Sequence, residues 1–315
     1  MRGRGSRIVF MGTPDFAVPS LKALIDERYT IPAVVTRPDR PKGRGRALSM
    51  PPVKEVALKH GIQVLQPERI KDRDFLESLK SLAPEVIVVV AYGRILPPEL
   101  IAIPPKGCIN LHSSLLPKYR GAAPINWAIL RGEEETGVTT MIMDEGMDTG
   151  PILLQEAVPI GEDDTAVTLH DRLSELGAGL LARTVSRVID ETIQPVIQDD
   201  SKATYAPMLK KEDGCIEWNK SAGEINNLVR GLLPWPGAYT RWSGRLLKIM
   251  EGTVKAADTG GVKPGTILAV SEKGIEVAAK SGIFVITELQ LAGKQRMTAA
   301  EFIKGYRIGT GQILN

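Results

Sequence analysis

EVIVVVAY, residues 85–92, is a continuous run of apolar and β-branched side chains. Such a run is typical of a central strand in a parallel sheet, because layers on both faces bury every side chain. RIVFMG (7–12) has the same character and is followed by the helical pattern PDFAVPSLKALIDER. Strands and helices alternate in this way over residues 7–190, which favours the α/β class. We predict an N-terminal domain, residues 1–190, with a Rossmann-like open, mostly parallel sheet and helices on both faces.

The pattern changes beyond residue 190. TIQPVIQDDSKATYAPMLKKED is polar and resembles a linker, and short strands separated by turns follow it, among them AYTRW, GTILAV and IFVITEL. Many short strands with turns are typical of small barrels. We predict a linker over residues 191–210 and a smaller C-terminal OB-like β-barrel domain over residues 211–315.

Length and composition limit the class of protein. A chain of 315 residues is expected to fold as two domains. The longest apolar run, VIVVVA (86–91), is far below the roughly 18 residues that a membrane span needs. The two cysteines, Cys108 and Cys215, are too few for a disulfide framework or a cysteine metal site. We expect a cytoplasmic protein with no membrane partner and no metal.

Positive charge is concentrated in two places. The chain carries +3 in total, and from Ala206 onward fifteen Lys/Arg stand against ten Asp/Glu. The loop RPDRPKGRGR (37–46) carries five Arg/Lys and one Asp, and its Gly and Pro residues exclude a helix. Basic patches attract polyanions, although a charged loop is also often only solvated.

The stretch INLH (109–112) ends a short apolar run with two side chains suited to chemistry. Side chains at i and i+2 of a strand point the same way, so Asn110 and His112 can face one site while Leu111 enters the core. An amide donor beside an imidazole can stabilise an oxyanion and manage protons in acyl transfer. The sequence has no Gly-x-Ser-x-Gly elbow and no Cys beside a His, the motifs that would suggest a covalent intermediate. Direct transfer of the acyl group therefore fits better. The alternative is a strand-end His bonded to a carbonyl, with Asn110 serving a turn.

The segment MDEGMDTGPIL (143–153) follows a predicted strand and sets acidic residues among glycines. Asp144, Glu145 and Asp148 could reach the same cleft as Asn110. A solvated turn is the alternative.

Several motifs together resemble the folate-dependent formyltransferase family, and within it the members that formylate methionyl-tRNA. The family pattern Asn-x-His with a downstream Asp in a D-x-G segment matches Asn110, His112 and Asp148. The other matching segments are HSSLLPKYRGAAPI (112–125), GTPDFA (12–17), VVVAYGRILP (88–97), MDEGMDTGPIL (143–153), LPWPGAY (233–239) and KPGTI (263–267).

The resemblance implies a reaction and its substrates. The formyl donor would be 10-formyltetrahydrofolate, and the acceptor would be the α-amino group of methionine on initiator tRNA, bound by its acceptor stem. Asn110 and protonated His112 would hydrogen-bond the tetrahedral oxyanion. Asp148 would orient His112 or a water that relays the proton. A monomer is expected.

The resemblance also implies binding residues. Folate contacts are expected from Arg94, Ile95, Leu96, Ser114, Leu115, Leu116, Pro117, Met143, Asp144, Glu145 and Met147. tRNA contacts are expected from Arg37, Arg40, Lys42, Arg44 and Arg46. Gly12, Thr13 and Pro14 are expected on the acceptor side. Core packing is the alternative for Ile95 and Leu96, and gap filling for Met143 and Met147.

The nearest rival functions share the fold and the formyl donor. A formyltransferase for an amino-sugar nucleotide also carries a β-rich second domain, and the basic loop 37–46 argues against it. A glycinamide ribonucleotide formyltransferase would be a shorter single domain. A formyltetrahydrofolate hydrolase would use water as acceptor, and a noncatalytic tRNA-binding protein would not need the Asn110, His112 and Asp148 set.

Overall fold

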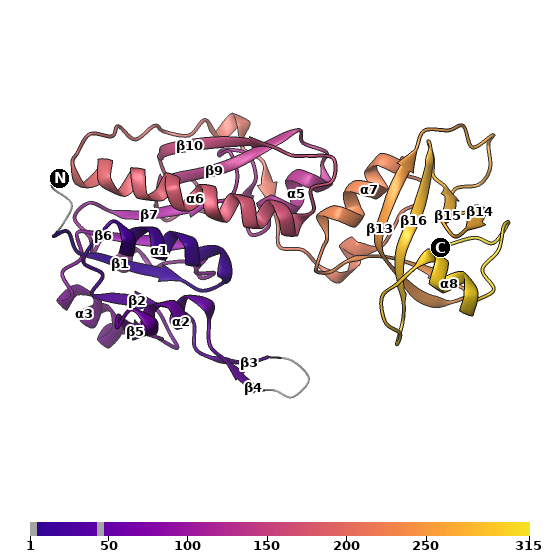
Figure 1. Cartoon of the computed structure of the whole chain (residues 1–315). Coiled ribbons are helices and arrows are strands. Elements are labelled where there is room, and N and C mark those ends of the chain that lie inside the picture. Colours follow the sequence, from indigo (N-terminus) through magenta and orange to yellow (C-terminus); the bar gives the residue numbers. More distant parts are fainter. Residues whose placement is uncertain (1–4, 43–46) are drawn as a thin grey trace. The chain divides into compact units, whose positions relative to one another are not determined.

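The computed structural model describes residues 5–42 and 47–315 (Figure 1). The chain divides into two compact units. Unit 1 comprises Met1–Gly121, Thr136–Val158 and His170–Ala206, and unit 2 comprises Ala122–Glu135, Pro159–Leu169 and Pro207–Asn315. The predicted division at residues 190 and 210 stays a prediction.

A seven-stranded sheet with the order β10-β9-β7-β6-β1-β2-β5 forms the centre of unit 1. The pairs β1/β2, β1/β6, β6/β7 and β2/β5 are parallel, whereas β7 and β9 are antiparallel. The strands are β1 (Ile8–Gly12), β2 (Ala33–Val35), β5 (Gln63–Leu65), β6 (Val86–Val90), β7 (Cys108–His112), β9 (Glu135–Ile142) and β10 (Ile152–Pro159). The predicted mostly parallel α/β sheet is confirmed, and EVIVVVAY supplies its β6.

Both faces of this sheet are covered, as the all-apolar strands require. On one face, Val9, Met11, Ile87 and Val89 share a core with Leu79 of helix α3. On the other face, Leu111 meets Gly177 of helix α6, and the hydroxyls of Thr140 and Thr184 are 2.8 Å apart. The helices that contribute to unit 1 are η1 (Asp15–Ala17), α1 (Val18–Asp26), α2 (Pro52–Lys59), α3 (Arg73–Ser81), α4 (Pro98–Ile101), α6 (Ala166–Ile189) and η2 (Asp200–Lys202).

Two small two-stranded pairs complete unit 1. The antiparallel pair β3 (Arg40–Lys42) and β4 (Ala47–Ser49) forms the base of the basic loop. The parallel pair β8 (Arg120–Gly121) and β11 (Tyr205–Ala206) joins the segment after β7 to the chain near residue 205.

Unit 2 is built on a six-stranded antiparallel sheet. The order is β12-β13-β16-β15-β14, with β17 on β16, so the predicted β-rich C-terminal region is confirmed. Trp218, Trp242, Phe284 and Phe302 lie in its core. Its elements are α5 (Pro124–Leu130), η3 (Lys211–Gly214), α7 (Ala222–Gly231), β12 (Ala238–Trp242), β13 (Arg245–Lys255), β14 (Ile267–Ser271), β15 (Gly274–Ala278), β16 (Ile283–Leu291), β17 (Met297–Thr298) and α8 (Ala299–Gly305).

No helix within residues 5–42 and 47–315 combines the length and the apolar character needed to cross a bilayer.

The two cysteines lie in opposite environments, and this predicts their reactivity. Cys108 is buried at the start of β7, and burial raises the pKa of its thiol to about 12. Cys215 is exposed. Because the thiolate is the reactive form, we expect one thiol per native chain to react with a thiol reagent at about pH 8. The Cys215→Ser protein should show none until it is unfolded; fast labelling of this variant would contradict the burial of Cys108.

Candidate active site

The ends of three neighbouring strands bring the predicted acceptor-side segment close to β6 and β7. Gly12 at the end of β1 is paired with Val90 of β6, and Val90 is paired with Leu111 of β7. A Cβ at Gly12 would lie 2.9 Å from the Cβ of Ala17 and 3.0 Å from the carbonyl oxygen of Val90. This close approach requires glycine, because a Cβ would push β1 and β6 apart.

Thr13 and Pro14 follow directly. The Thr13 hydroxyl donates to the Tyr92 carbonyl at 3.3 Å, and Pro14 is the N-cap of η1. The three residues predicted on the acceptor side therefore lie together at the carboxyl end of β1, where ligand loops of open α/β sheets are found.

Asn110 and His112 lie on one face of β7, as alternation along a strand predicts. Asn110 is half-buried, and within the described residues its side-chain amide has no hydrogen-bond partner. His112 is 7% exposed. A buried polar group is normally paired, so a half-buried amide that lacks a partner is available to a ligand.

The hydrogen bond of His112 assigns its two ring nitrogens. Nε2 lies 2.9 Å from the carbonyl oxygen of Tyr119. Since a carbonyl oxygen only accepts, Nε2 donates and carries a proton in both charge states of the ring. Nδ1 is therefore the nitrogen that can take up and release a proton, and it faces Asp148.

Asp148 lies close to His112 without touching it. Its Oδ2 is 3.7 Å from His112 Nδ1, longer than a hydrogen bond, and accepts a 2.8 Å hydrogen bond from the Gly121 amide. The Asp148 backbone has φ +54°, a left-handed conformation that is uncommon outside glycine. The two atoms are therefore near enough for one bound group to contact both, although they are not hydrogen-bonded to each other.

The path of the loop that carries Asp148 differs from the simple strand-end picture. Because β9 runs antiparallel to β7, Ile142 at its end pairs with Ile109, and the Met143 amide donates to the Cys108 carbonyl at 2.8 Å. The loop therefore starts beside the beginning of β7, and Asp148 reaches the end of that strand only after five further residues.

Arg120 and Gln198 adjoin Asp148, and the sequence analysis did not single them out. Gln198 Nε2 donates to the Asp148 carbonyl at 2.9 Å, and Arg120 Nη2 donates to Gln198 Oε1 at 2.8 Å. Arg120 lies inside the quoted segment HSSLLPKYRGAAPI, which was the available signal. Gln198 lies in the polar stretch interpreted as a linker, where no pattern marks it.

The three residues predicted to contact folate after β6 have different environments. Arg94 Nη1 donates to the carbonyls of Pro67 and Glu68, at 3.1 and 2.9 Å. Ile95 is 84% exposed, whereas Leu96 is buried in the core beside α3 and α4. Ile95 is thus free to cover a ligand, and the side chain of Leu96 packs in the core.

The segment after β7 and the loop after β9 hold the other predicted folate contacts. The Ser114 hydroxyl is buried and donates to the Lys118 carbonyl at 2.6 Å. Leu116 is buried, while Leu115 and Pro117 are partly exposed. Asp144 Oδ1 accepts from the Gly146 amide and the Thr149 hydroxyl, which shapes its loop.

Along the same loop, Met143 packs against the core, Glu145 is exposed and Met147 is 60% exposed.

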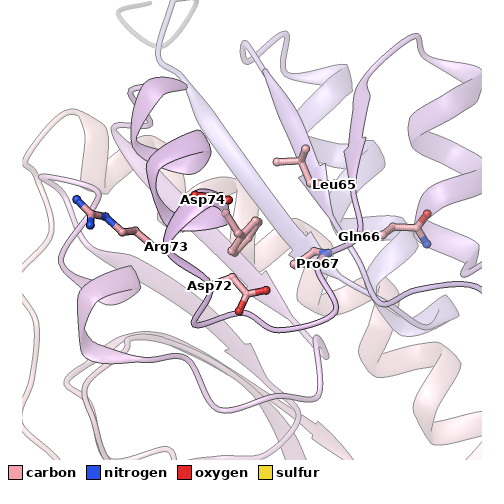
Figure 2. Close-up of a pocket in the computed structure, with 7 residues that line it drawn as sticks. Leu65, Gln66, Pro67, Asp72, Arg73 and Asp74 are labelled. Carbon is pink, nitrogen blue, oxygen red and sulfur yellow. The ribbon is translucent and has the colours of Figure 1, made fainter.

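Pro67, whose carbonyl accepts a hydrogen bond from Arg94, lines a cavity of about 530 Å³ (Figure 2). Its lining residues are Leu65, Gln66, Pro67, Asp72, Arg73, Asp74 and Phe75. The lining combines three apolar side chains, Leu65, Pro67 and Phe75, with charged and amide groups. None of these residues was predicted as a site residue.

The basic loop has a defined base. Arg37 donates from Nη2 to the Gly93 carbonyl; burial lowers the pKa of its guanidinium, and Arg94 and Arg40 lower it further. Arg40 is exposed on β3, and Lys42 ends this strand. Arg44 and Arg46 lie outside the described residues.

An ion pair closes the base of the loop. Lys54 Nζ lies 2.7 Å from Asp39 Oδ2, and Gln66 Nε2 donates to both Asp39 and the Arg37 carbonyl. Arg37 therefore belongs to the anchored base, and Arg40 is the described arginine of the loop that is open to a partner.

In the part of the chain that the structure describes, no three His, Cys, Asp or Glu side chains are grouped to hold a metal ion.

Comparisons with known proteins find similar proteins along most of the chain. The family described as "Formyl transferase" matches residues 6–185, and "Formyl transferase, C-terminal domain" matches residues 208–307. A methionyl-tRNA formyltransferase of Acetivibrio thermocellus is 52% identical, covering 98% of this chain and 99% of that protein. A methionyl-tRNA formyltransferase of Pelobacter propionicus is 55% identical, covering 98% and 95%.

Solved structures share the fold at lower identity. An N-formyltransferase from Helicobacter canadensis, in complex with folinic acid and dTDP-3-aminofucose, is 21% identical with a TM-score of 0.67, covering 93% of this chain and 100% of that one. HypX from Aquifex aeolicus, in complex with tetrahydrofolic acid, is 17% identical with a TM-score of 0.64, covering 97% and 50%.

The loop that carries Asp148 requires glycine at residue 150. A Cβ at Gly150 would overlap the carbonyl oxygen of Ile142, which belongs to the backbone of β9. We expect Gly150→Ala to lower the free energy of unfolding by about 1–3 kcal/mol, measured by urea denaturation. The matched control is Gly179→Ala in α6, where a Cβ would meet only the Arg183 side chain at 3.9 Å. This change should instead stabilise the protein by about 0.5–1 kcal/mol. Equal effects of the two substitutions would argue against the overlap.

Proposed function

This chain belongs to the formyl transferase family, and we propose that it transfers the formyl group of 10-formyltetrahydrofolate to the α-amino group of methionyl initiator tRNA. The product would be N-formylmethionyl-tRNA for translation initiation. The observation that carries the choice of acceptor is the 51–55% identity, over 98% of the chain, to proteins named methionyl-tRNA formyltransferase. The Asn110, His112 and Asp148 arrangement supports transfer at one site on β7.

Asn110 has the role of oxyanion donor in the proposed mechanism. The neutral amine of methionine attacks the formyl carbon, whose oxygen becomes negative in the tetrahedral intermediate. The unpaired Asn110 amide donates to this oxygen. Loss of one such donor typically slows a reaction by about 10²–10³-fold.

His112 manages the proton through Nδ1, because Nε2 is occupied by the Tyr119 carbonyl. Protonated Nδ1 donates to the oxyanion, and Asp148, whose Oδ2 lies 3.7 Å from Nδ1, orients the ring or a water that relays the proton. The proton lost by the attacking amine passes along this relay to N10 of folate. The bond between the formyl carbon and N10 then breaks, and the new bond between the formyl carbon and the methionine nitrogen remains.

The residues fit a folate, which supplies an activated formyl group when bound. Ile95 and Met147 expose apolar side chains that suit a flat ring, and the Asn110 amide suits a reacting carbonyl. Arg94, Leu96, the segment Ser114–Pro117 and the segment Met143–Glu145 complete the proposed folate contacts.

tRNA binding rests on charge. The loop 37–46 carries a net +4, and residues from Ala206 onward carry an excess of five positive charges. We infer that unit 2 has an OB-like barrel fold suited to a nucleic acid backbone. The protein is expected to work as a monomer. It is expected in the cytoplasm, because aminoacylated tRNA is found there.

An amino-sugar nucleotide is the second candidate acceptor. The Helicobacter canadensis protein, crystallised with such a compound, supports this candidate through its fold alone, at 21% identity. The basic loop favours tRNA, because a nucleotide sugar needs no such arm.

The first experiment tests the reaction itself. The protein is incubated with 10-formyltetrahydrofolate and methionyl initiator tRNA, the ester is stripped, and formylmethionine is measured by mass spectrometry. Wild-type protein should produce it, and Asn110→Ala should be slower by about 10²–10³-fold because the oxyanion loses a donor.

A parallel reaction contains an amino-sugar nucleotide in place of the tRNA. Formyl transfer to the sugar or to water, with none to methionine, would refute the tRNA assignment and retain the fold. Near-normal turnover by Asn110→Ala would refute the oxyanion role.

The salt dependence of tRNA binding tests the basic loop. Each phosphate contact adds to the fall of the affinity with salt, so Arg40→Ala should lower the slope of log K against log salt by about 1. Lys80→Ala on α3 is the control, since Lys80 is exposed but pairs with Glu77 outside the loop. Equal slopes for Arg40→Ala and the wild type would remove Arg40 from the tRNA contacts.

A further inference from the structure

Arg120 is a buried cation that the proposed mechanism does not use. Arg120 is only 2% exposed, and its guanidinium has hydrogen-bond partners inside the protein. Nε and Nη2 donate to Gln198 Oε1 at 3.2 and 2.8 Å, and Nη2 lies 2.7 Å from Asp200 Oδ1. A buried charge is retained only where its hydrogen bonds are satisfied, so this arrangement demands a reason.

Gln198 links this cation to the backbone beside Asp148. Because Arg120 can only donate, the Gln198 oxygen must face it, and the Gln198 NH₂ must face the opposite way. There, Nε2 donates to the carbonyls of Asp148 and Gly150, at 2.9 and 2.7 Å. Gln198 is 8% exposed, and both polar atoms of its side chain are hydrogen-bonded inside the protein.

The chain around Gln198 is itself fixed at both ends. Val196 and Ile152 exchange two backbone hydrogen bonds of 2.8 Å, and β11 pairs with β8 at Arg120 and Gly121. Gln198 therefore stands on a backbone that is tied to β10 on one side and to the Asp148 partner Gly121 on the other.

Asp148 needs such support because its left-handed backbone, with φ +54°, is unfavourable for a residue with a Cβ. This backbone conformation directs the carboxylate to the Gly121 amide and to His112 Nδ1. Gln198 donates to the carbonyls of Asp148 and Gly150, which lie on either side of Thr149.

We propose that Gln198, oriented by Arg120, is a positioning residue that holds the backbone of Asp148 in the turn that directs its carboxylate to His112. This proposal rests on the role given to Asp148 in the proposed function. Gln198 reaches the reaction only through Asp148, so its loss should slow the chemical step and leave the binding of folate and tRNA unchanged.

Gln198→Glu is the sharpest variant, because a carboxylate keeps the shape and the acceptor for Arg120 but cannot donate to the two carbonyls. We expect its single-turnover rate of formyl transfer to fall by about 10- to 100-fold, as for small misplacements of catalytic groups. The dissociation constants of folate and tRNA should stay within about twofold of the wild type.

The matched control is Gln194→Glu, which makes the same change in the same segment at an exposed residue. It should transfer formyl groups at the wild-type rate. If Gln198→Glu fails to fold, Arg120→Lys, which keeps the charge and loses the forked donor, is measured in the same way.

A double-mutant cycle with Asp148→Asn separates positioning from general support of the fold. If Gln198 acts through Asp148, adding Gln198→Glu to Asp148→Asn should slow the reaction by less than about twofold. Losses that multiply, or a Gln198→Glu protein of full rate, would overturn the positioning role.

The outcomes for this proposal and for the proposed function differ. Full activity of Asp148→Asn would refute the relay, whereas an inactive Asp148→Asn beside a fully active Gln198→Glu would refute only the positioning role. If another acceptor replaces methionyl-tRNA, the cycle is run with that acceptor, because Gln198 touches no substrate.

Discussion

The backbone ladder that joins β7 to β6 on one side and to β9 on the other is the constraint on which the site depends. The register pairs Val89 with Asn110 and Asn110 with Met141, so the face of the sheet on which Asn110 lies is set by hydrogen bonds on both edges. A shift of one residue would turn Asn110 and His112 towards α6 and place Leu111 on the reactive face. Burial of Leu111 against Gly177 opposes such a shift.

The antiparallel direction of β9 has a second consequence. It returns the chain to the beginning of β7, so the loop that carries Asp148 must cross back along the sheet to reach His112. The end of this loop, residues 148–150, is half-buried or buried, so its backbone needs partners. Gln198, Gly121 and the exchange between Ile152 and Val196 supply them.

The distribution of charge separates chemistry from recognition. At the end of β7, the Nε2 of His112 and the Oδ2 of Asp148 each have a backbone partner, whereas the Asn110 amide has none among the described residues. The basic loop instead has a paired base, where Asp39, Lys54 and Gln66 fix Arg37, and an exposed arginine at residue 40. An anchored base with an exposed arginine suits contacts to phosphates, which need position and charge more than a preformed cavity.

Local pattern was sufficient for the central strands β1, β6 and β7 of unit 1, for the β-rich character of unit 2 and for the shared face of Asn110 and His112, because alternation and apolar runs depend on neighbouring residues alone. The same patterns could not separate exposed Ile95 from buried Leu96, since adjacent apolar residues differ only in what packs over them. They could not show that Arg37 is tied to Gly93 or that the Nε2 of His112 is occupied by Tyr119. Nor could they mark Gln198, which is fifty residues from Asp148 in the chain. The sequence by itself determined the central strands, the family motifs and the reactive residue types. The tertiary structure alone decided which polar atoms meet, because hydrogen bonds between distant segments follow from strand order and loop path.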